Sequence, residues 1–143
     1  MSTRPMPLLL LVACLLTEPA HPAQTQPNPR NLVAVTAPGH DPLFVDAASV
    51  QKRGNIVAFK YVLDVLAPPD EHSPARAWRS NEIEASIDCA KKTVTVRRLT
   101  AYPGPRGSGT ATGVHTFAAA DVRPERITAK STFAYLENHV CGN

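Results

Sequence analysis

The chain has 143 residues, of which 43% are hydrophobic, enough for one globular domain with a buried core. Its formal net charge is only +3, whereas a nucleic-acid-binding domain usually carries a dense basic stripe. We therefore expect no nucleic-acid partner. The 14 prolines are clustered, and they mark turns and linkers because proline neither donates to a β-ladder nor continues a helix.

The amino terminus has the features of a signal peptide. Arg4 precedes an apolar run over residues 7–16. This run is shorter than the roughly 20 residues that a membrane span needs, but it has the length of a signal-peptide core. The chain then becomes polar, and Ala23 is a small residue of the type found at cleavage sites, although His21 occupies a position where a second small residue is preferred.

Two alternatives to cleavage after Ala23 remain open. Residues 11–14 resemble a bacterial lipobox, in which Cys14 is lipidated and becomes the first residue, although the leucines at 15–16 extend the apolar run beyond that cut. The other alternative is a buried amino-terminal helix, but no helical pattern continues past Thr17. Since no second hydrophobic segment follows, we expect a mature chain that does not span a membrane, with a lipid anchor at Cys14 as one route to the membrane surface.

We expect three segments: a signal peptide over residues 1–23, a polar proline-rich tether over 24–30 and a folded domain over 31–143. Of the three cysteines, two remain in the folded domain, Cys89 and Cys141. An exported domain lies in an oxidising compartment, where an even number of cysteines favours a disulfide. Such a bridge would contribute about 4 kcal/mol through the long loop that it closes. The alternatives are two unpaired buried thiols or, less favoured because no histidine pair lies nearby, a metal site.

The first half of the domain alternates between extended segments and turns. Asp46 can accept backbone N–H groups as a cap, Gly54 suits a turn, and from Ile56 onward odd positions are apolar while Lys60 and Asp64 hold even positions, as in a strand with one buried face. In chain order we expect a strand over 31–37, an extended piece over 43–45, a capped turn over 46–50, a turn over 51–55, a strand over 56–66 and a loop over 67–77.

The second half predicts a hairpin, a further strand and a helix. Phe133, Leu136 and Val140 recur at helical spacing, and Ser131 is a suitable N-cap. The helix would end at Cys141, so a bridge to Cys89 would link its end to a strand. In chain order we expect a strand over 78–89, a turn over 90–92, a strand over 93–102, a flexible loop over 103–109, a strand over 110–117 and a helix from 131 to 141.

This order of features resembles the surface-adhesin protein E family. Residues 43–50 are similar to its aromatic/Val-Asp-x-x-Ser-Ile segment, and residues 54–57 to the Gly-Asn-x-Val start of its long strand. Residues 84–89 are similar to its cysteine-ended strand, and residues 124–141 to its terminal helix with the second cysteine. The resemblance covers residues 32–141.

The resemblance implies an α+β fold, an antiparallel sheet of about six strands with a C-terminal helix packed on it and one disulfide. It also implies export to the periplasm or the outer-membrane surface of a Gram-negative cell. Some members bind host extracellular-matrix or serum proteins, so we expect a non-enzymatic module that binds protein or glycan ligands. The alternative is a periplasmic accessory or inhibitor protein acting on a bacterial envelope partner.

The chain offers no strong catalytic motif, and we expect neither an enzyme nor a cofactor or metal. Glu82 and Glu84 share one strand face, a spacing compatible with a glycosidase pair, but a solvated strand face is the favoured interpretation. The histidines lack metal-ligand spacing, and no serine lies in a Gly-x-Ser-x-Gly elbow.

One basic patch is a candidate binding site. Lys91 and Lys92 lie at the tip of the predicted hairpin and Arg106 lies in the next loop, so the three could together attract acidic glycans or acidic protein segments. Arg97 and Arg98 are adjacent in one strand, and strict alternation predicts that they point to opposite faces of the sheet.

Overall fold

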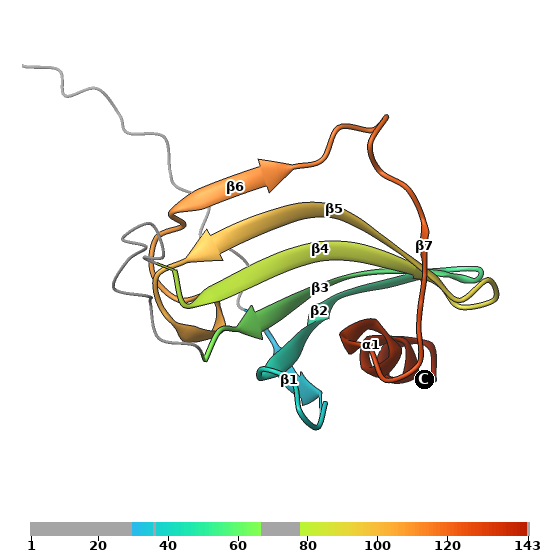
Figure 1. Ribbon diagram of the computed structural model, residues 1–143, viewed down its shortest axis with the longest axis horizontal. Helices are drawn as coiled ribbons and strands as arrows, with labels where there is room; N and C mark the ends of the chain where they lie inside the picture. Colours follow the sequence, from blue (N-terminus) through green and yellow to red (C-terminus); the bar gives the residue numbers. More distant parts are fainter. Residues whose placement is uncertain (1–29, 36, 67–77, 143) are drawn as a thin grey trace, which may run out of the picture.

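The computed structural model describes residues 30–35, 37–66 and 78–142. These residues form one seven-stranded antiparallel sheet and one α-helix (Figure 1). The predicted signal peptide, the lipidation candidate Cys14, most of the tether and the loop over 67–77 lie outside the described residues. None of the described helices is long and apolar enough to cross a membrane.

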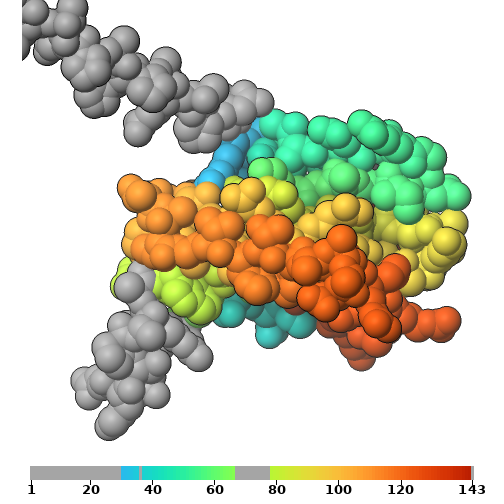
Figure 2. All heavy atoms as spheres, turned by 90° about the horizontal axis from the view of Figure 1, so that it is seen from above, coloured from blue at the N-terminus to red at the C-terminus, as the bar shows by residue number. Residues whose placement is uncertain are grey.

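The strands are arranged in the sheet in their order along the chain. The order is β1-β2-β3-β4-β5-β6. The short strand β7 also pairs with β5, at Thr93 and Val94. Seen from above, β6 and the segment after it cover one edge of the sheet (orange in Figure 2). The bounds are β1 Leu32–Val35, β2 Leu43–Arg53, β3 Ile56–Asp64, β4 Ser80–Asp88, β5 Thr93–Tyr102, β6 Gly113–Thr116 and β7 Glu125–Arg126.

The central pairing, β3 with β4, has an uninterrupted register from Ile56 opposite Asp88 to Asp64 opposite Ser80. Because side chains alternate along both strands, one set of residues points to each face. The apolar set of β3 and β4 is buried in the core: Val57, Phe59, Tyr61, Ile83, Ala85 and Ile87. The fold class predicted from the sequence is confirmed.

The helix α1 (Thr132–Cys141) covers this apolar face (Figure 1). Ser131 is its N-cap, as predicted, with Oγ accepting a hydrogen bond from the backbone N–H of Ala134 at 3.2 Å. Leu136 is fully buried and Val140 is 5% exposed. Burial beneath the helix also raises the pKa of the Tyr61 phenol well above its usual range, because the phenolate would lose its hydration.

The disulfide joins Cys89, directly after β4, to Cys141, the last residue of α1, with their Cα atoms 5.9 Å apart. The predicted pairing is confirmed. Isolated helices of fewer than about 12 residues are marginal in water, and α1 has 10 residues. The helix therefore depends on its apolar stripe and on this covalent link.

The predicted turn over residues 46–50 is wrong, because β2 continues through it to Arg53. Its pairing with β3 is interrupted between Asp46 and Gln51, where four residues of β2 lie opposite one residue of β3. Asp46 does accept backbone N–H groups, from Asn31 at 3.0 Å and Ala48 at 3.1 Å. It supports a bulge rather than a helical turn, and bulges of this kind bend a strand without ending it.

Candidate functional site

The second face of the sheet, opposite α1, carries the polar side chains of β3 and β4 and is the candidate functional site; we call it the open face. Lys60, Glu82 and Glu84 belong to this face by register, since Lys60 lies opposite Glu84. No helix among the described residues covers it. One end is closed by a short turn, and the other end is a shallow depression.

The closed end of the open face is held by Arg30, a residue that we predicted to be the last of the tether. Its guanidinium donates hydrogen bonds to the carbonyl of Gly107 at 2.6 Å and to the hydroxyl of Tyr102 at 2.8 Å. It also pairs with Glu82 at 2.8 Å and lies 4.8 Å from the centre of the Tyr102 ring. The folded domain therefore includes residue 30, and Arg30 ties the start of the domain to β4, β5 and the turn after β5.

That turn, the 3-10 segment η1 (Pro105–Gly107), lies inside the stretch predicted to be a flexible loop. Asp64 Oδ1 accepts from the backbone N–H of Arg106 at 2.6 Å. Ser80 Oγ accepts from the Gly107 N–H at 2.8 Å and donates to the Gly104 carbonyl at 2.6 Å. These side chains fix the turn against the sheet, so it is a closed structural element rather than a free loop.

Lys60 forms the centre of an ion-pair network on the open face. Its Nζ lies 3.0 Å from Glu84 Oε1 and 3.8 Å from Glu82 Oε1. The hydrogen bond to Glu84 raises the pKa of Lys60 above its usual range, although partial burial and the charge of Arg98 oppose this effect. Both glutamates that the sequence places on one strand face are thus paired with Lys60 on the open face.

Glu82 also differs from the solvated strand residue expected from the sequence, because it is only 9% exposed. Arg30 and Lys60 compensate its charge from two sides. Burial of a carboxylate is costly unless it is paired. The burial could not be deduced from the strand pattern, because one of the two cations that compensate it, Arg30, is far away in sequence.

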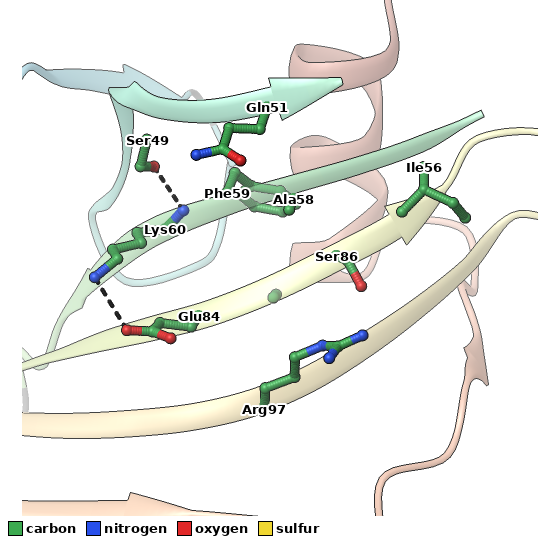
Figure 3. Close-up of a pocket in the computed structure, with 10 residues that line it drawn as sticks. Ser49, Gln51, Ile56, Ala58, Phe59, Lys60, Glu84, Ser86 and Arg97 are labelled. Carbon is green, nitrogen blue, oxygen red and sulfur yellow. Dashed lines mark hydrogen bonds and ion pairs between the residues drawn. The ribbon is translucent and has the colours of Figure 1, made fainter. Parts of the chain in front are cut away.

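Arg97 and Arg98 lie on the same face, so the prediction from strict alternation is wrong. Ala85 pairs with Val96 and Glu84 with Arg98, which makes Arg97 an additional residue of β5. Such a bulge interrupts alternation. Arg97 lines the depression on the open face (Figure 3). Arg98 lies opposite Glu84 and its charge acts on Lys60.

The depression, which we call the trough, has a volume of about 280 Å³. In Figure 3 its side chains lie in front of the sheet, with α1 behind it. It runs across four strands, and its floor is partly apolar. The lining residues include Ser49 and Gln51 of β2, Ile56, Ala58 and Lys60 of β3, Glu84 and Ser86 of β4, and Arg97 of β5.

The predicted basic patch is divided by the structure. Lys91 and Lys92 lie in the turn between β4 and β5, where Lys91 pairs with Asp88 at 3.6 Å and Lys92 with Glu137 at 3.8 Å. Arg106 lies beyond the far end of β5, in η1, with its guanidinium 5.6 Å from the centre of the Phe44 ring. The three side chains are thus at opposite ends of the sheet. Ligand binding by either part stays a prediction.

The described residues contain no group of three or more metal-ligating side chains. Two of the histidines for which the sequence predicts no role pack on aromatic rings at separate places. His40 lies 5.7 Å from Tyr135, and His115 lies 4.5 Å from Phe117.

The described part of the chain is thus a small disulfide-linked α+β domain, with an ion-paired open face and a shallow trough. Residues 32–142 match the surface-adhesin protein E family, so the chain belongs to this family. The resemblance seen in the sequence is confirmed. The family is one of surface adhesins rather than enzymes, which supports an adhesin-like exported envelope protein.

Solved structures of a Haemophilus influenzae protein share the fold. Protein E from non-typeable Haemophilus influenzae is similar with a TM-score of 0.58 and 18% identity, over 82% of this chain and 80% of that chain. Crystal form II of Haemophilus influenzae protein E gives a TM-score of 0.53 and 20% identity, over 70% of this chain and 80% of that chain. A comparison with curated protein sequences gives no match. At these identities the likeness is one of fold.

Proposed function

We propose that this protein is an exported, non-enzymatic adhesion module that binds protein or glycan ligands at the outer surface of the cell. The observation that carries the proposal is the family match over residues 32–142. The open face agrees with it, because no other described element covers its trough. A binding module needs an accessible face on a rigid scaffold, and the disulfide and the Arg30 network supply the rigidity.

Binding is supported by the state of the acids on this face. Glu82 and Glu84 are both paired with Lys60, and Glu82 also with Arg30. These ion pairs fix the shape and the charge distribution of the open face.

Protease treatment of intact cells expressing the protein tests the surface location, with a periplasmic protein as the control. We expect the domain to be digested while the periplasmic control survives. Purified oxidised protein is then assayed against a panel of immobilised extracellular-matrix and serum proteins. If domain and control both survive until the outer membrane is opened, the proposal of surface adhesion is wrong and the partner is to be sought within the envelope.

A further inference from the structure

The bulge in β5 concentrates positive charge at the trough. Arg97 and Arg98 are both exposed, and neither forms an ion pair with a described residue. The acid opposite Arg98, Glu84, is paired with Lys60 at 3.0 Å, so the positive charge of the two arginines exceeds the negative charge beside them. Two adjacent guanidinium groups therefore face solvent beside a ready-made depression. Guanidinium groups bind carboxylates through paired, charge-assisted hydrogen bonds.

The trough also has an apolar side. Ile56, at its edge, is 43% exposed, and Ala58 beside it is exposed as well. Gln51 and Ser86 add neutral polar groups to the lining. A surface that combines an apolar patch, neutral hydrogen-bonding groups and one focus of positive charge is complementary to an extended chain that presents apolar and acidic side chains on the same side.

We propose that the trough binds an extended protein segment that places a carboxylate on Arg97 and Arg98 and an apolar side chain from the same side of the segment on Ile56 and Ala58, since every second side chain of an extended chain points to the same side. This inference rests on the proposed function, since it names the ligand class and the site of the same binding module. A polyanionic glycan fits less well, because it has no apolar group for Ile56 and it would bring charges against Glu84.

The test uses two synthetic peptides of twelve residues, one with the repeat Glu-Ser-Leu-Ser and one with the repeat Gln-Ser-Leu-Ser, so that the acidic or amide side chains share one side of the extended chain with the leucines. A heparin oligosaccharide is the third probe. Binding to the oxidised, isotope-labelled protein is followed by NMR, including the arginine Nε–Hε signals. We expect the Glu peptide to shift the signals of Arg97, Arg98 and Ile56, and the shifts to decrease as salt rises, because exposed charges are screened.

The variant Arg97→Ala/Arg98→Ala should weaken binding of the Glu peptide by about tenfold or more, since each charge-assisted hydrogen bond contributes measurably. The matched control is Arg79→Ala/Arg123→Ala, which removes the same charge from two exposed positions outside the trough. It should leave the affinity within about twofold of the unaltered protein, because distant surface charges are largely screened.

Several results would overturn the inference: equal binding of the Gln peptide, equal loss in both double variants, or absence of shifts at the trough. Heparin bound at Arg97 more tightly than the Glu peptide would assign the site to glycans and overturn it too. The proposed adhesion function is judged separately. If Arg97→Ala/Arg98→Ala still binds the matrix proteins, that function stands and only the trough is excluded as its site.

Discussion

The disulfide should account for a large part of the stability of the domain. Replacing Cys89 and Cys141 by alanine opens a loop whose ends are 52 positions apart in the sequence. In the chain-entropy treatment, a loop of this length restricts the unfolded chain enough to contribute about 4 kcal/mol to the free energy of unfolding. Domains of this size are usually stable by only roughly 5–15 kcal/mol. We therefore expect the double variant to be folded only marginally.

Urea unfolding, followed by circular dichroism and by the fluorescence of Trp78, measures this loss. The unfolded chain of the alanine variant is less restricted and exposes more surface, so the dependence of the unfolding free energy on urea should become steeper. The unaltered protein treated with a reductant serves as a control and should behave like the variant. A loss below about 1 kcal/mol with an unchanged slope would refute the view that the bridge acts on the unfolded chain.

Three further predictions concern the helix, the open face and the turn after β5. Leu136→Ala, at a fully buried position, should cost about 2–5 kcal/mol in the same urea assay, because it leaves a cavity under α1; a loss like that of a surface residue would contradict the packing. Glu84→Gln should lower the pKa of Lys60, measured by NMR titration, since the hydrogen bond to Glu84 is the largest cause that raises it. Because the folded-state pKa is the higher one, this pair stabilises the fold below the ordinary lysine pKa, and the benefit is lost as pH rises through the folded-state value; an unchanged titration in the variant would exclude the pair as the cause. Gly107→Ala should destabilise by about 1–3 kcal/mol, because Gly107 has φ of 68° and its added Cβ would overlap the guanidinium that holds the turn. Gly54→Ala, where φ is 59° and the space is open, should cost only about 1 kcal/mol, and equal effects of the two changes would argue against a close contact at Gly107.

The parts of the fold that depend on local pattern could be predicted from the sequence. Alternation identified β3 and β4, and the Thr and Val content after a short turn identified β5. The apolar stripe of Phe133, Leu136 and Val140 with its cap identified α1. The pairing of Cys89 with Cys141 followed from counting cysteines in an exported chain. The strand and helix signals lie in residues close together in the sequence. The disulfide was expected because an exported domain lies in an oxidising compartment.

The candidate site depended on features that no local pattern contains. A bulge is a property of two paired strands, so nothing in the residues around Arg97 predicts that β5 gains a residue there. Arg30 contacts partners 72 and 77 positions away. Its role therefore depends on the arrangement of the strands in the sheet. Arg30 contributes both to the compensation of the buried Glu82, together with Lys60, and to the closed turn at Gly107, together with Asp64 and Ser80.

The order of the strands has a consequence for how the chain folds. From β1 to β6 each strand pairs with its neighbour in sequence, so the sheet can grow by the successive pairing of neighbouring strands, which keeps the entropic cost of loop closure low. The links that span long stretches of chain include those of Arg30 with the turn at Gly107, His40 with Lys130, and Cys89 with Cys141. We expect these to form last. A kinetic intermediate with a complete meander, an undocked helix and reduced thiols would then precede the native state.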